Sequence, residues 1–107
     1  MDPVEGQMEA YNARDIEKFL TYFTPDVVAE DGEGNILMRG HQELRERYGP
    51  SFLRHPHAHC VSANRLRIGK YVVDEERIAG LRPDGEVRAI IVYRLEGDLI
   101  AYWRVLS

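Results

Sequence analysis

The sequence contains a single cysteine and no long hydrophobic run, and each scarcity excludes a class of protein. Cys60 has no partner for an internal disulfide, and one thiol with four histidines gives no zinc spacing unless carboxylates are added. The longest apolar stretches span only a few residues, and no basic segment followed by an apolar run stands at the N-terminus. We therefore expect a cytoplasmic protein that is neither secreted nor inserted in a membrane.

Basic residues are too few for a nucleic-acid-binding surface. The 14 lysines and arginines are interspersed with 18 acidic residues, and the formal net charge is -4. Phosphate backbones and anionic membranes need a basic footprint on the protein, so we expect neither as a partner. The chain also has no glycine-rich phosphate loop and no recognised metal-ligand spacing, so we predict no cofactor and no metal.

The 107 residues suit one domain spanning residues 1–107, and 44% hydrophobic residues are enough for one core. The first helix is predicted to begin at Asp2-Pro3-Val4-Glu5, where an N-cap, a first-turn proline and a capping box coincide. A second helix should begin at Asp15 and end before Pro25. A third should begin near His41 and continue to Leu53.

The remaining segments alternate in the manner of strands. Short strands at 27–30 and 36–39 flank a loop rich in glycine, and long strands are predicted at 57–68, 71–81, 86–95 and 99–106. Helices gathered on an antiparallel sheet make an α+β fold. On the last two strands we expect one face to carry Ile90, Val92, Trp103 and Val105, and the other Ile91, Tyr93, Tyr102 and Arg104. One of these faces should meet the helices or a cavity and the other a partner or water, and aromatic side chains on the outward face would suit a dimer interface.

This order of elements, with the segments AYNARDI (10–16) and FTPDVV (23–28), resembles the nuclear transport factor two-like superfamily, and most of all its ketosteroid isomerase and SnoaL-like branch. The resemblance spans nearly the whole chain. It implies three helices packed on a curled antiparallel sheet, a cone-shaped α+β barrel around a pocket for a small hydrophobic molecule, and a homodimer. Members include isomerases, dehydratases, cyclases and plain binding proteins, so the fold does not settle the function.

The same resemblance places a catalytic aspartate at Asp31, in the segment VVAED (27–31). Burial in an apolar cavity raises the pKa of a carboxyl group and makes its anion a stronger base. On this interpretation, Asp31→Asn abolishes turnover. The alternative is an ordinary hairpin turn, in which the Asp31 side chain accepts backbone hydrogen bonds.

The oxyanion donors of the isomerase are not matched. Its tyrosine position falls at Gln7 and its acid position at Ile91 or Val92, so only Gln7 or Tyr11, one helical turn later, offers a substitute donor. Loss of one such donor slows catalysis by on the order of 10²–10³-fold. Authentic steroid isomerisation is therefore not expected without that substitute.

Two further groups have two interpretations each. His57 and His59 alternate, so they could point into the pocket and complete a dehydratase-like set with Asp31, or lie exposed at a sheet edge. Aromatic side chains could line the substrate pocket or form only the core: Phe19, Phe23, Tyr48, Phe52 and Trp103.

Asp74 and Glu76 share a strand face and could form an acid–base pair. A two-residue turn at Gly69-Lys70 would instead place Arg65 opposite Asp74 and diagonal to Glu76, which favours cross-strand ion pairs. The sequence as a whole predicts a pocket enzyme, an isomerase, dehydratase or cyclase with Asp31 as the base. The alternative is a non-catalytic dimeric module that binds a ligand or a protein.

Overall fold

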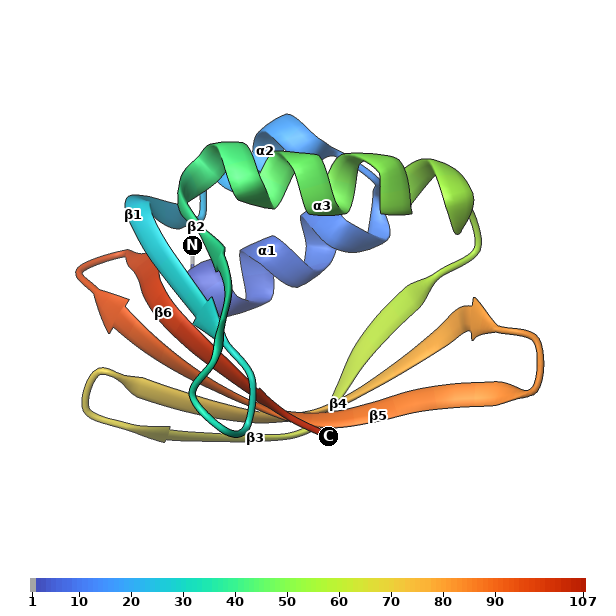
Figure 1. Ribbon diagram of the computed structural model, residues 1–107. Coiled ribbons are helices and arrows are strands. Elements are labelled where there is room, and N and C mark those ends of the chain that lie inside the picture. The colour runs from blue at the N-terminus through green and yellow to red at the C-terminus, as the bar shows by residue number, and fades with distance from the viewer. Residues whose placement is uncertain (1) are drawn as a thin grey trace.

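The computed structural model describes residues 2–107, which form an α+β fold of three helices over one curled six-stranded sheet (Figure 1). The helices are α1 (Pro3–Asn12), α2 (Ile16–Leu20) and α3 (Gly40–Arg54). The strands are β1 (Phe23–Glu30), β2 (Ile36–Arg39), β3 (His59–Ile68), β4 (Tyr71–Arg82), β5 (Gly85–Glu96) and β6 (Leu99–Leu106). All three helices lie on the concave side of the sheet, so this side and the helices enclose the interior.

The helix starts follow the local sequence. The Asp2 carboxylate accepts a hydrogen bond from the Val4 N–H at 3.2 Å, and the Asp15 carboxylate accepts one from the Lys18 N–H at 3.1 Å. These caps satisfy N–H groups that have no partner within the helix. The α2 helix ends at Leu20, earlier than predicted, because β1 already begins at Phe23.

The strand order is β2-β1-β6-β5-β4-β3, so the short hairpin belongs to the same sheet as the long strands. The β1 strand pairs in parallel with β6, and every other neighbouring pair is antiparallel. This pairing bends the sheet around the helices. Gly80 permits a close approach at the edge of β4, since its φ is +84° and a Cβ there would lie 2.4 Å from the His57 carbonyl oxygen.

The predicted faces of the last two strands are wrong by one residue. Arg94 pairs with Tyr102 but Leu95 pairs with Ile100, so Ala101 is an extra residue in β6. A bulge of this kind shifts the register by one and exchanges the faces. The concave face therefore carries Ile91, Tyr93, Trp103 and Val105, and the convex face carries Ile90, Val92, Tyr102 and Arg104.

The core lies between the helices and the concave face, where α2 contributes Phe19, which is 2% exposed, and β6 contributes Ile100, which is fully buried. None of the helices within residues 2–107 is long and apolar enough to cross a membrane. The homodimer stays a prediction. The convex face that it would use exposes Ile90, Leu66 and Tyr71.

Candidate functional site

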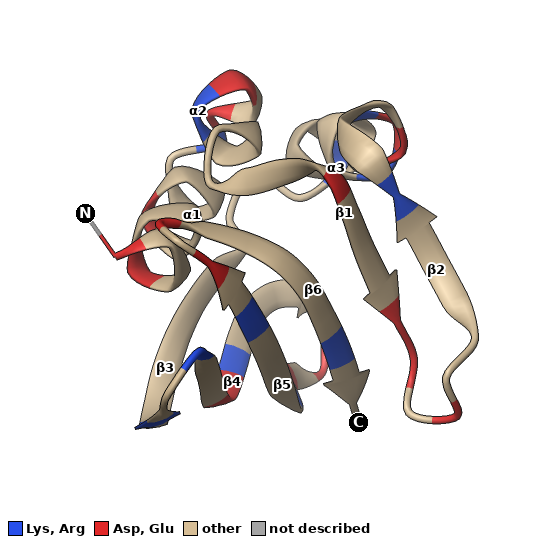
Figure 2. Cartoon of the chain, turned by 90° about the vertical axis from the view of Figure 1, so that its left-hand side faces the viewer, with Lys and Arg blue, Asp and Glu red and all other residues tan. Residues whose placement is uncertain are grey.

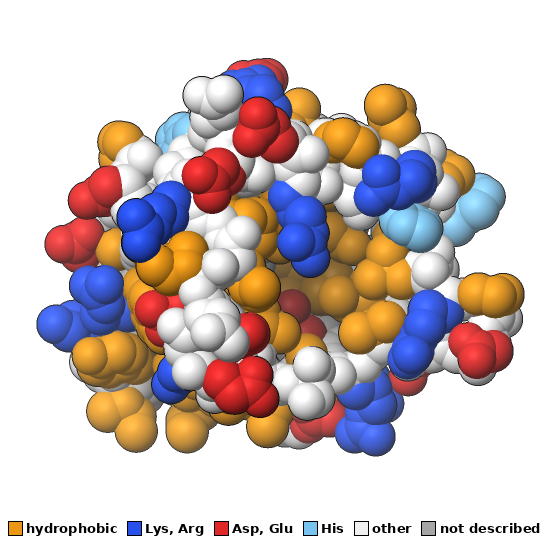
Figure 3. All heavy atoms as spheres, in the orientation of Figure 1, with side chains coloured by type: hydrophobic (Ala, Val, Ile, Leu, Met, Phe, Trp, Pro, Cys, Tyr) orange, Lys and Arg blue, Asp and Glu red, His pale blue; other side chains and the backbone are white. Residues whose placement is uncertain are grey.

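A cavity of about 340 Å³ opens between α1, α3 and the concave face of the sheet. Figure 3 shows this hollow lined mostly by hydrophobic side chains, with acidic atoms at its floor and a basic side chain at its rim. Only two charged side chains line it within the described part of the chain, Arg47 from α3 and Glu76 from β4. Its volume and apolar lining are those of a site for a small organic molecule.

Glu76 is the acidic group of this cavity. It alternates along β4 with Val72, Asp74 and Ile78, so the pleat points all four side chains to the concave side. Glu76 is only 6% exposed. Burial of a carboxyl group requires hydrogen-bond partners, and the structure supplies them from β5 and β3.

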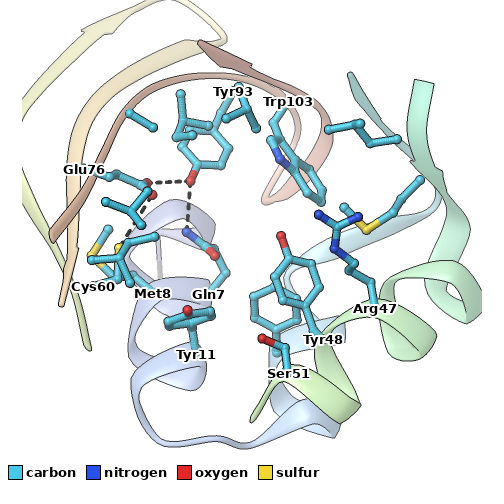
Figure 4. Close-up of a pocket in the computed structure, with 18 of the residues that line it drawn as sticks. Gln7, Met8, Tyr11, Arg47, Tyr48, Ser51, Cys60, Glu76, Tyr93 and Trp103 are labelled. Carbon is cyan, nitrogen blue, oxygen red and sulfur yellow. Dashed lines mark hydrogen bonds between the residues drawn. The ribbon is translucent and has the colours of Figure 1, made fainter. Parts of the chain in front are cut away.

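A chain of three polar side chains joins α1 to β4 across the cavity (Figure 4). The Tyr93 hydroxyl donates to Glu76 Oε2 at 2.7 Å, and the Gln7 amide donates to the Tyr93 oxygen at 3.2 Å. Gln7 Nε2 also donates to the Val4 carbonyl at 3.1 Å, and the Cys60 thiol contacts Glu76 Oε1 at 3.5 Å. Both oxygens of Glu76 are thus held in place, and both N–H groups of Gln7 are in use.

Burial raises the pKa of Glu76 from its ordinary value of 4.5 to about 7. The nearby Asp74 carboxylate contributes to this rise, while the hydrogen bond from Tyr93 opposes it. A carboxyl group with a pKa near neutrality exists in both protonation states under physiological conditions. Glu76 can therefore accept a proton and return it, which suits general acid–base catalysis.

Arg65 does not neutralise Glu76. As predicted, Arg65 lies opposite Asp74, and its Nε and Nη2 donate to the Asp74 carboxylate at 2.6 and 2.9 Å. Its Nη1 donates to Glu5 on α1 at 2.6 Å, so the expected diagonal pair with Glu76 is absent. The residue directly opposite Glu76 is Ser62, so no cation faces Glu76 across this strand pair.

Two tyrosine hydroxyls are free to meet a ligand. Tyr11 from α1 and Tyr48 from α3 line the cavity with their rings 6.4 Å apart and nearly perpendicular. Neither hydroxyl has a hydrogen-bond partner among residues 2–107. Burial raises the pKa of both phenols, that of Tyr48 strongly, so both stay protonated and can donate to an oxygen of a bound molecule.

Asp31 lies outside this cavity, which corrects the expectation that it faces the substrate. It follows β1 directly, and its carboxylate accepts hydrogen bonds from the Glu33 and Asn35 N–H groups, both at 2.9 Å, and from the Asn35 amide at 3.1 Å. These bonds lower the pKa of Asp31 and make it a weak base. Figure 2 shows the acidic residues of this hairpin at the end farthest from the helices.

Asp31 instead borders a neighbouring groove with Gly32 and Leu106. The alternative interpretation of the Asp31-Gly32 pair as a hairpin turn is thus the one that the structure supports. The side chain satisfies the backbone of its own loop.

The two histidines are also outside the cavity. His57 lies in the loop before β3, and His59 is paired with Ala79 on the convex face, so both side chains are exposed. Phe52 is buried in the core behind the cavity wall, 5.4 Å from the Tyr11 ring. The other predicted pocket residues do line the cavity: Gln7, Tyr11, Phe19, Phe23, Tyr48 and Trp103.

Sequence reasoning missed Tyr93 and Arg47 as members of the site, and it favoured a cross-strand ion pair over a catalytic role for Glu76. The signal for Glu76 was present, since two carboxylates, those of Asp74 and Glu76, stand on one strand face between Val72 and Ile78 and only one arginine lies opposite them. Tyr93 was grouped with Tyr102 and not with Trp103, because the bulge in β6 was not foreseen. No group of three or more histidine, cysteine or acidic side chains able to hold a metal ion occurs in the described residues.

The raised pKa of Glu76 predicts that the contribution of this group to stability falls as pH rises. Between pH 4.5 and about 7 the folded protein binds a proton at Glu76 that the unfolded chain has released. The contribution of Glu76 to the unfolding free energy should therefore be largest below pH 4.5 and should decrease through pH 7, by roughly 3 kcal/mol. Glu76→Gln removes the titrating group without changing its shape. Urea unfolding of both proteins across this range isolates the effect, and a difference that stays constant with pH contradicts the raised pKa.

The fold has counterparts among known proteins. The SnoaL-like domain family matches residues 4–103. A cystatin-fold protein from Novosphingobium aromaticivorans is 23% identical, with a TM-score of 0.88 over 100% of this chain and 99% of that one. A candidate polyketide cyclase from Sinorhizobium meliloti is 17% identical, with a TM-score of 0.82 over 96% of this chain and 92% of that one.

A candidate ketosteroid isomerase from Kribbella flavida is 13% identical, with a TM-score of 0.77 over 97% of this chain and 73% of that one. Comparison with curated proteins gave no significant match. At these identities the solved structures establish a common fold, and the family match covers nearly the whole chain. The chain therefore belongs to the SnoaL-like domain family, within the nuclear transport factor two-like superfamily.

Proposed function

We propose that this protein catalyses proton transfer on a small hydrophobic carbonyl compound without a cofactor, as an isomerase, dehydratase or cyclase does. One observation carries the proposal: the buried Glu76, with a pKa of about 7, lies in an apolar cavity with free phenol donors. The base is thus Glu76 and not Asp31. The structural likeness to a candidate polyketide cyclase and a candidate ketosteroid isomerase supports this reaction class.

In the proposed reaction, the Glu76 carboxylate removes a proton from a carbon next to the carbonyl group. The electron pair of that C–H bond moves toward the carbonyl oxygen, which becomes an enolate oxygen. The hydroxyl of Tyr11 or Tyr48 donates a hydrogen bond to that oxygen and stabilises its developing charge. Glu76 then returns the proton to another carbon, which completes an isomerisation, or to a departing hydroxyl group, which completes a dehydration.

Solvent deuterium exchange tests the proposal without knowledge of the natural substrate. A bicyclic ketone such as 2-decalone is incubated with the protein in D₂O, and deuterium at the α carbons is followed by mass spectrometry. We expect the wild-type protein to exchange these protons faster than buffer does. A panel of bicyclic and tricyclic ketones that all exchange at the buffer rate contradicts the proposal.

Asp31→Asn should leave this exchange unchanged, because the Asp31 carboxylate accepts hydrogen bonds from the backbone of its own loop and lies outside the cavity. The expected rate lies within about 2-fold of wild type, since surface substitutions rarely alter a folded site. The measurement is the same exchange assay, with a thermal melt to show that the hairpin is intact. A large loss of rate in a folded Asp31→Asn protein would return the catalytic role to this residue.

A non-catalytic ligand-binding module is the second candidate. It is favoured by one observation, that the Glu76 oxygens already have Tyr93 and Cys60 as partners without any ligand. Trp103 is the only tryptophan of the chain and lines the cavity, so its fluorescence reports binding. Ketones that change this fluorescence and do not exchange their protons would favour the binding module.

A further inference from the structure

Arg47 is a charged side chain at the cavity with no ion pair or hydrogen bond to any described residue. Several other arginines form ion pairs, namely Arg45 with Glu17, Arg65 with Asp74 and Glu5, Arg67 with Asp2, and Arg88 with Glu75, and none of these arginines lines the cavity. Arg47 belongs to the cavity lining, and Figure 4 shows its side chain extending from α3 toward Trp103. It differs from the paired arginines in facing the space that a ligand would occupy.

The local sequence offers Arg47 an ion pair that the structure does not use. Glu43 lies four residues before Arg47 on α3, a spacing that favours a salt bridge on a helix. The Glu43 carboxylate instead accepts a hydrogen bond from the Arg39 N–H at 2.8 Å, at the start of the helix. The guanidinium is therefore left available to the cavity.

The surroundings of Arg47 define the kind of group it can bind. Its guanidinium is directed toward Trp103, and the apolar wall of the cavity begins there (Figure 4). A guanidinium presents a planar fork of donors that matches a carboxylate. Glu76 belongs to β4 on the opposite wall, so an anion at Arg47 is placed at the α3 side while the reacting carbon faces Glu76.

We propose that the ligand is an amphipathic carboxylic acid, whose carboxylate binds Arg47 and whose hydrocarbon body fills the cavity between Phe19, Trp103 and Ile91. This inference rests on the proposed function only for the role of the carbon that faces Glu76. The carboxylate subsite is independent of any reaction. If the protein transfers protons as proposed, this subsite restricts its substrates from carbonyl compounds in general to keto acids with a bulky hydrophobic body.

A matched pair of probes tests the charge requirement. Decalin-2-carboxylate and decalin-2-carboxamide have nearly the same shape, and neither fluoresces, so quenching of Trp103 gives both dissociation constants at about pH 7, where the acid is ionised. We expect the wild-type protein to bind the carboxylate about 10-fold more tightly than the amide, because only the carboxylate forms a charge-assisted pair with Arg47, and this pair lies near the surface. Arg47→Gln should abolish this preference and leave the affinity for the amide unchanged.

Two further variants complete the test. Arg47→Lys keeps the charge and should retain part of the preference, whereas Arg45→Gln, on the same helix and paired with Glu17 outside the cavity, should retain all of it. Equal binding of the two probes by the wild-type protein overturns the inference, as does a preference that survives Arg47→Gln. Because these readouts need no turnover, they stand even if Glu76 proves not to transfer protons.

Discussion

Glu76→Gln should lower the rate of α-proton exchange by about 10²–10⁴-fold, the usual contribution of a positioned general base. Glutamine has the same shape as glutamate and can accept the hydrogen bond from Tyr93, but its amide does not take up a proton near neutrality. The cavity and its aromatic lining should remain in place. The ketone should therefore still bind the variant and quench its Trp103 fluorescence, while the rate of α-proton exchange falls toward that of buffer.

Glu75→Gln is the matched control for this loss. Glu75 precedes Glu76 on β4 but points to the convex face, where it accepts hydrogen bonds from Asn64 and Arg88. The same chemical change there should leave exchange unaltered. The rate of the wild-type protein should also increase with pH as Glu76 ionises, with an apparent pKa of about 7. Exchange that persists in Glu76→Gln assigns the base to another group.

The element order could be predicted because its signals are local. The cap at Asp2, the helix start at Asp15 and the two-residue turn at Gly69-Lys70 depend on residues close together in sequence, and all are found in the structure. The register predicted from that turn, Arg65 opposite Asp74, is also confirmed. Interactions within a turn or a helix end need no knowledge of the rest of the chain.

The candidate site was harder to predict because it depends on two bulges. The extra residue at Ala101 sets which of Tyr93 and Val92 faces inward, and the one between Ser62 and Asn64 sets what stands opposite Glu76. A bulge leaves no clear mark in hydrophobic alternation, yet it moves every later side chain to the other face. The pocket residues on the helices, Gln7, Tyr11, Phe19 and Tyr48, could therefore be named from the sequence, while the acid and the inner tyrosine of the pocket could not be placed.

Arg65→Met should destabilise the protein by about 3–5 kcal/mol, because it removes the partner of a buried carboxylate. The Asp74 side chain is fully buried, and the Arg65 guanidinium is its bidentate partner. The same guanidinium pairs with Glu5, so its loss also removes one contact between α1 and the sheet. The free energy of unfolding of a small domain is only about 5–15 kcal/mol, so this substitution removes a large part of it.

Urea unfolding near the temperature of maximum stability measures this loss, with Arg67→Met as the control. Arg67 lies two residues further along β3 and pairs with Asp2 at the surface, so its replacement should cost at most about 1 kcal/mol. Replacing both partners, Arg65→Met with Asp74→Leu, should recover most of the stability, because the stranded charge is then gone. If the double variant is as unstable as Arg65→Met, the loss of stability comes from the lost contact between Arg65 and Glu5 on α1 and not from the buried carboxylate.

The double variant should also have a lower pKa at Glu76, since the Asp74 charge is one cause of the elevation of this pKa. The pH dependence of α-proton exchange should then shift to lower pH.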